Sequence, residues 1–63
     1  MNTYHLADKI NGVFETFQAE DDHEAREYFE QYIQEELEIY KGQNTYEELK
    51  DFFFLLHEDR TEV

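Results

Sequence analysis

Two glycines, in a chain that contains no proline, constrain the fold more than any other feature. Gly12 and Gly42 are the only glycines among the 63 residues, and both stand where the pattern of apolar side chains changes. Glycine and proline are the residues that most often interrupt regular structure. The sequence therefore divides into three segments, 3–20, 21–41 and 44–58, which we expect to fold as a single small domain over residues 1–63.

The middle segment has the clearest helical pattern. Its apolar side chains recur at steps of three and four residues: Ala25, Phe29, Tyr32, Ile33, Leu37 and Tyr40. Asp21 or Asp22 can cap the start of this helix, and Gly42 suits the position just after its end. The pattern predicts a helix over about 22–41.

The third segment carries a second helical pattern. Asn44 or Thr45 can cap its start. Two acidic residues, Glu47 and Glu48, would then lie in the first turn, where the helix dipole favours negative charge. The apolar side chains on one face are Tyr46, Leu49, Phe53 and Leu56. We predict a helix over about 45–58.

Five consecutive apolar residues, FFFLL, would be apolar around most of the circumference of that helix. Phe53 and Leu56 continue the face that points to the core. Phe52, Phe54 and Leu55 would then stay partly exposed unless something covers them. These three form a candidate apolar interface for a second subunit, which would make a homodimer, or for another partner.

The first segment fits two patterns. Its apolar side chains make a helical stripe: Leu6, Ile10, Val13, Phe14 and Phe17. Asn11-Gly12, however, is a strong hairpin signal, and Gly12 inside a helix would cost about 1 kcal/mol relative to alanine. A β-hairpin over about 3–19, packed on two helices, is therefore favoured, which gives an α+β fold. An all-α three-helix bundle remains the alternative.

The hairpin interpretation also predicts which side chains face the helices. An even loop length puts five apolar residues on one face of the sheet: Tyr4, Leu6, Val13, Phe17 and Ala19. Asp8 and Glu15 share that face, and a two-residue turn would set the two carboxylates opposite each other.

The net charge narrows the classes of partner. Seventeen acidic and five basic residues give a formal charge of −12, beyond the magnitude of about 2 to 8 that solubility requires. Such a charge opposes direct binding to nucleic acid or to an anionic membrane, and it suits a basic protein. No apolar run approaches the roughly 18 residues of a membrane span, and the N-terminus lacks the pattern of a signal peptide, so we expect a cytoplasmic protein.

Catalytic and metal-binding patterns are weak. The chain has no cysteine, no serine and no glycine-rich phosphate loop, so we expect neither an enzyme nor a cofactor. His5, His23 and His57 accompany many carboxylates, but only Glu20 and His23 show the Glu-x-x-His spacing of di-iron helices. We therefore expect no metal site and interpret the histidines as solvated surface residues.

Acidic residues form rows along the predicted middle helix, opposite its apolar face. The candidate partner-binding surface consists of Glu20, Asp21, Asp22, Glu24, Glu27, Glu30, Glu35 and Glu38. Neighbouring like charges in such a row repel by a few tenths of a kcal/mol per pair, and only Arg26 interrupts it before Lys41. A solvated acidic face is one interpretation. The other is that the row imitates the regularly spaced phosphates of DNA.

Part of the sequence resembles a known family. YKG at 40–42, followed by TYEEL at 45–49 and DF at 51–52, is similar to a recurrent segment of the acidic antirestriction proteins carried by plasmids and transposons. In size and composition the chain also resembles small acidic phage products that inactivate host DNA enzymes. The resemblance implies a DNA mimic that inhibits a basic DNA-binding protein of host defence, repair or the nucleoid. The competing class is a protein-interaction module, such as an antitoxin, adaptor or assembly factor, that binds through the aromatic patch.

Overall fold

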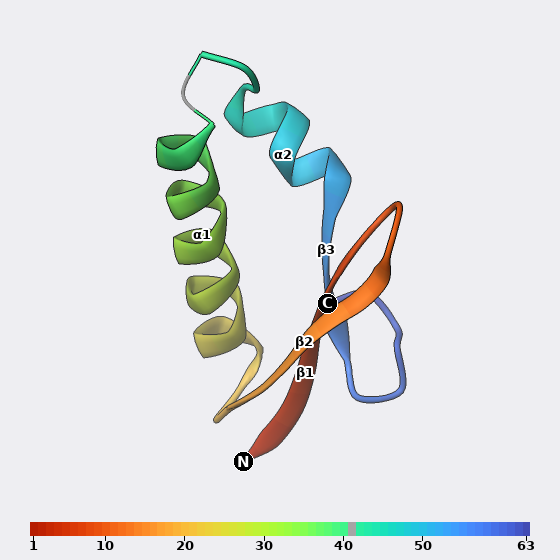
Figure 1. The fold of residues 1–63 in the computed structure, drawn as a ribbon. Coiled ribbons are helices and arrows are strands. Elements are labelled where there is room, and N and C mark those ends of the chain that lie inside the picture. The colour runs from red at the N-terminus through yellow and green to blue at the C-terminus, as the bar shows by residue number, and fades with distance from the viewer. Residues whose placement is uncertain (41) are drawn as a thin grey trace.

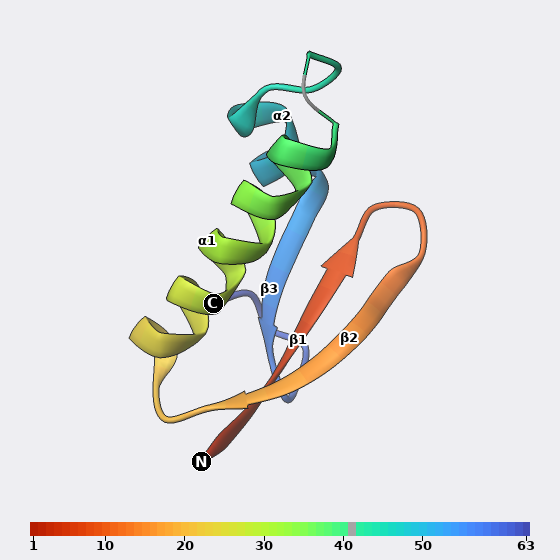
Figure 2. The same ribbon diagram turned by 60° about the vertical axis from the view of Figure 1, so that its left-hand side comes forward.

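A computed structural model describes residues 1–40 and 42–63. Its elements are strands β1 (Asn2–Asp8) and β2 (Gly12–Ala19), helices α1 (Asp22–Ile39) and α2 (Tyr46–Phe52), and strand β3 (Phe53–His57). The strands form an antiparallel sheet in the order β2-β1-β3, and α1 lies along one side of it (Figures 1 and 2). The predicted α+β class is confirmed, and the three-helix alternative is wrong.

The hairpin turn differs from the two-residue turn that the sequence suggested. Residues 9–11 connect the strands, and only Gly12 has a positive φ, 75°. The side chain of Asp8 closes the turn by accepting a hydrogen bond of 2.6 Å from the backbone N–H of Asn11. Asp8 pairs with Gly12 in the ladder, so it does not lie opposite Glu15 as the shorter turn would require.

A β-bulge changes the faces of β2. Leu6 pairs with Glu15 and Ala7 with Val13, which leaves Phe14 as the extra residue. Because Leu6 faces the core, its neighbour Ala7 and the paired Val13 point to the other face of the sheet. The expectation that Val13 joins the core is therefore wrong, and the ring of Phe14 packs on the helix side instead.

Helix α1 begins as predicted. The Asp21 side chain caps it by accepting a hydrogen bond from the Glu24 backbone N–H at 2.9 Å. The last helical residue is Ile39, and Tyr40 is the C-cap. The predicted end at Lys41 lies outside the described residues.

The third segment is only half helical. Thr45 caps α2 in a reciprocal capping box, but the chain becomes extended at Phe53 and forms β3. The predicted helix over 45–58 is therefore wrong beyond residue 52, because residues 53–57 pair with β1. Leu55 pairs with Leu6 and is only 5% exposed, so the expectation that it stays exposed is wrong. Leu56, expected in the core, lies on the other face.

The core lies between α1 and the sheet, with β1 as the central strand. Its buried members are Tyr4, Leu6, Ala19, Ala25, Phe29, Ile33, Leu49 and Leu55. Every helix and strand contributes at least one of them. The C-terminal residues close the second edge of β3, since the Val63 N–H donates to the Leu55 carbonyl at 3.0 Å. This leaves β2 as the open edge of the sheet.

Candidate functional site

The exposed side of α1 carries a row of carboxylates. Five glutamates, which we call the outward row, are all exposed: Glu20, Glu24, Glu27, Glu35 and Glu38. A helical step of about 100° per residue places the four that belong to α1 on the side of the axis opposite Phe29 and Ile33, the residues that anchor α1 in the core, while Glu20 lies just before the helix. Sequence reasoning therefore located this part of the acidic surface correctly in space.

Hydrogen bonds hold the start of the outward row in place. The Glu24 carboxylate accepts a bond of 3.1 Å from the Glu20 backbone N–H, while Asp21 accepts one from the Glu24 backbone. Asp21 is the N-cap, and Glu24 accepts from the residue before it, so the two bonds tie the helix start to the preceding chain. Asp21 is exposed, so its charge adds to the surface while its side chain fixes the helix start.

Two of the expected surface residues do not belong to the outward row. Asp22 is half-buried and faces the sheet, where the Tyr4 hydroxyl donates to it at 2.7 Å. Glu30 is also half-buried and accepts a bond of 2.7 Å from the Tyr46 hydroxyl of α2. Both carboxylates bind groups of their own chain, so the structure sets them apart from the exposed row, and their part in partner binding stays a prediction.

Tyrosine hydroxyls satisfy the inward carboxylates in place of lysine or arginine. The pairs are Tyr4 with Asp22, Tyr28 with Glu15 and Tyr46 with Glu30. The bonded carboxylate is the first cause that raises the pKa of Tyr28 and Tyr46, whereas burial comes first for Tyr4. All three pairs join different elements, so no local spacing in the sequence could have revealed them.

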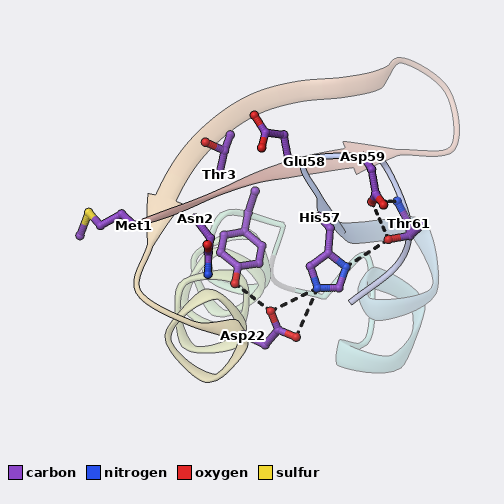
Figure 3. A pocket seen from close by; sticks show the side chains of 9 residues that line it. Met1, Asn2, Thr3, Asp22, His57, Glu58, Asp59 and Thr61 are labelled. Carbon is purple, nitrogen blue, oxygen red and sulfur yellow. Dashed lines mark hydrogen bonds and ion pairs between the residues drawn. The ribbon is translucent and has the colours of Figure 1, made fainter.

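A chain of polar side chains ties the start of α1 to the end of β3 (Figure 3). His57 Nε2 lies 3.2 Å from the Asp22 carboxylate, and Nδ1 lies 3.2 Å from the Thr61 hydroxyl. That hydroxyl donates to Asp59 at 2.6 Å. The expectation that His57 is a solvated surface residue is therefore wrong. The network lines an open pocket of about 610 Å³.

The network resembles an acid–histidine–hydroxyl arrangement, but its hydroxyl group is not bonded in the way that a nucleophile would be. A general base must take the proton of the nucleophile that it serves. The proton of Thr61 is directed to Asp59 instead of His57. The same bond is the first cause that lowers the pKa of Asp59. The side chains therefore act as a clamp between the helix and the C-terminal turn.

The clamp makes folding sensitive to acid. The hydrogen bond from Tyr4, followed by that from His57, lowers the pKa of Asp22. A carboxyl whose folded pKa is depressed contributes stability that is present above its unfolded value of about 3.9 and is lost as the pH falls through the folded value. We expect Asp22→Asn to destabilise the protein at about pH 5 and to have little effect at about pH 2.

Urea denaturation of both proteins across this pH range measures the difference. Glu38→Gln is the control, since it removes an exposed carboxylate from the same helix. The control should not destabilise the protein at any pH in the range. If Asp22→Asn lowered the free energy of unfolding by the same amount at every pH, the carboxylate charge would play no part in the clamp.

The candidate apolar interface is not one surface. Phe52 lines a pocket beside the hairpin turn, whereas Phe54 pairs with Ala7 on the sheet face that points away from α1. Leu55, the third member, is buried in the core. The three residues differ in direction because the chain passes there from a helix into a strand.

Within residues 1–40 and 42–63, no group of three or more His, Asp or Glu side chains is arranged to hold a metal ion. In the same part of the chain, no helix has the length and apolar character needed to cross a membrane. Comparisons with protein-family models, curated proteins and solved structures give no match to this chain.

Proposed function

We propose that this protein is a non-enzymatic inhibitor that presents the outward row to a basic DNA-binding protein in the cytoplasm, in the place that DNA phosphates would occupy. The observation that carries the proposal is the series of exposed glutamates along one side of α1, where Glu27 also lies 3.2 Å from His23 Nε2. Arg26 is the single lysine or arginine of α1, and it lies about 100° or more around the axis from each member of the row within the helix.

The spacing of the row suits a phosphate mimic. At about 1.5 Å per residue, the 14 steps from Glu24 to Glu38 span about 21 Å. Successive members stand about one helical turn apart, except where Gln31 separates Glu27 from Glu35. DNA also presents regularly repeated negative charge and releases counterions when a basic protein binds. A basic groove that binds the row would release counterions from the groove in the same way.

The row is held ready for binding. Its helix is capped at Asp21 and anchored by three fully or nearly buried side chains, Ala25, Phe29 and Ile33. A surface that is already ordered loses little conformational entropy when it binds. This supports an inhibitor that competes with DNA, which is itself a stiff polyanion.

Affinity capture from a host lysate tests the proposal. The immobilised protein is compared with a variant in which Glu27, Glu35 and Glu38 are lysine. We expect a basic DNA-binding protein on the first resin alone, retained at about 50 mM salt and released at about 500 mM. Equal capture by both resins, or a partner without a nucleic-acid role, would instead favour an antitoxin, adaptor or assembly factor.

A further inference from the structure

A second pocket, of about 640 Å³, lies where the hairpin turn meets the end of α1 and the start of α2. Four of the rings that line it also contact one another: Phe14, Tyr32, Phe52 and Phe53. Their centroid separations run from 5.0 Å for Phe52 and Phe53 to 5.9 Å for Phe14 and Phe53. Tyr40, which is 44% exposed, adds a fifth ring. We call this site the ring pocket.

Three carboxylates line the ring pocket as well, those of Asp8, Glu36 and Glu48. Two of them are held by donors of the chain: Asp8 accepts backbone N–H bonds of the hairpin turn, and Glu48 accepts from the Thr45 N–H at 2.8 Å. Burial raises the pKa of Tyr32, and the Glu36 carboxylate raises it further. An ionised carboxylate offers about four lone-pair sites, so each can accept further bonds from a ligand.

Within the described residues, no lysine or arginine lines the ring pocket. Elsewhere the chain does place its own cation on aromatic rings. Lys50 Nζ lies 5.0 Å from the centroid of Phe29 and 5.8 Å from that of Tyr46. Lys9 is bound to Asp51 at 2.9 Å. Among residues 1–40 and 42–63, the ring pocket therefore combines aromatic walls and three carboxylates without a lysine or arginine in its lining.

We propose that the ring pocket binds the guanidinium group of an arginine on the basic partner protein. A guanidinium is planar, stacks on aromatic faces and donates paired hydrogen bonds to carboxylates, whereas a lysine ammonium is more strongly hydrated. A cation over a ring gains about two- to fivefold in affinity even at an exposed site. This inference depends on the proposed function only for the source of the arginine.

The ring pocket lies on a different side of α1 from the outward row. Glu36 and Tyr40 belong to the C-terminal part of α1 and its cap, about 100° to 160° around the helix axis from Glu35 and Glu38. A partner that binds both sites must therefore wrap around this end of α1, with one arginine in the pocket and others on the row. Arginine and aromatic residues are enriched among the few side chains that dominate interface affinity.

Titration of the isotope-labelled protein with a capped Gly-Arg-Gly peptide, followed by NMR, tests the inference. The control peptide carries citrulline, which has the shape of arginine without its charge. We expect chemical-shift changes centred on Phe14, Tyr32 and Tyr40, and at least about tenfold tighter binding of the arginine peptide. Equal binding of the citrulline peptide, or changes confined to the outward row, would overturn the inference.

Variants separate the ring pocket from the outward row. Glu36→Gln keeps the size and shape of the side chain and removes its charge, so peptide binding should weaken about five- to tenfold. Glu38→Gln makes the same change two residues away, on the outward row, and should weaken peptide binding less than about twofold. Equal losses would overturn the inference.

Tyr40→Leu provides a second variant that leaves Glu36 unchanged, and it should also weaken peptide binding. The spectrum of each variant without peptide shows that it is folded. Peptide binding that persists while lysate capture fails would contradict the proposed function and leave the ring pocket supported. Lysate capture without peptide binding would support the proposed function and contradict the ring pocket as an arginine site.

Discussion

Reversal of Glu27, Glu35 and Glu38 to lysine is expected to weaken partner binding at least about 100-fold while making the protein more stable. Each substitution changes the charge by two units, so the three take the net charge from −12 to −6. Like charges facing one another across an interface cost several kcal/mol, which accounts for the loss of binding. Within the chain the same changes relieve repulsion, and at position 38 lysine also suits the helix C-terminus.

A control with the same net charge separates local from overall electrostatics. Glu47, Glu58 and Glu62 are exposed and lie outside α1, and their reversal to lysine also leaves a charge of −6. We expect this control to weaken binding less than about tenfold, mainly through slower association. Binding is measured by titration calorimetry with the captured partner, and stability by thermal denaturation. Equal loss in the two triple variants would mean that the outward row has no special role.

Replacement of Ile33 by alanine is expected to destabilise the fold by about 2 to 5 kcal/mol. The side chain is 0% exposed and joins α1 to the sheet. A domain of about 60 residues buries only about 60% of the surface of its unfolded chain, so a loss of this size should leave much of it unfolded at room temperature. Urea denaturation monitored by circular dichroism measures the effect.

The same helix offers a matched control in Ile39→Ala. Ile39 is 69% exposed, and alanine has the higher helix propensity, so we expect a change within about 0.5 kcal/mol. A similar loss of stability in Ile33→Ala and Ile39→Ala would contradict the assignment of Ile33 to the core. It would also weaken the argument that the core presents the outward row on a fixed helix.

Local patterns in the sequence favoured the hairpin over the helical alternative and were sufficient for α1, but they did not predict the length of the turn or the bulge. Gly12 takes the positive φ that only glycine adopts freely, and apolar residues at helical steps place Phe29 and Ile33 in the core. The end of the third segment could not be predicted in this way. A run of five apolar residues fits a helix or a strand equally, and its pairing with β1 involves residues about 50 positions away.

For the candidate site, too, the sequence predicted what depends on local spacing and missed what depends on contacts between elements. Helical spacing located the outward row, because exposure follows directly from the position of the apolar stripe. The inward direction of Asp22 and Glu30 depends on Tyr4 and Tyr46, which come from other elements. The ring pocket was missed for the same reason, since it joins the hairpin turn, α1, α2 and β3.

The most direct test of the proposed function is a competition between this protein and duplex DNA for the captured partner. Fluorescently labelled DNA is bound to the partner, and the protein is added at several salt concentrations. The proposal predicts complete displacement of DNA at saturation, an affinity that falls steeply with salt, and no displacement by the variant reversed at Glu27, Glu35 and Glu38. A ternary complex that retains the DNA, or an affinity independent of salt, would contradict it.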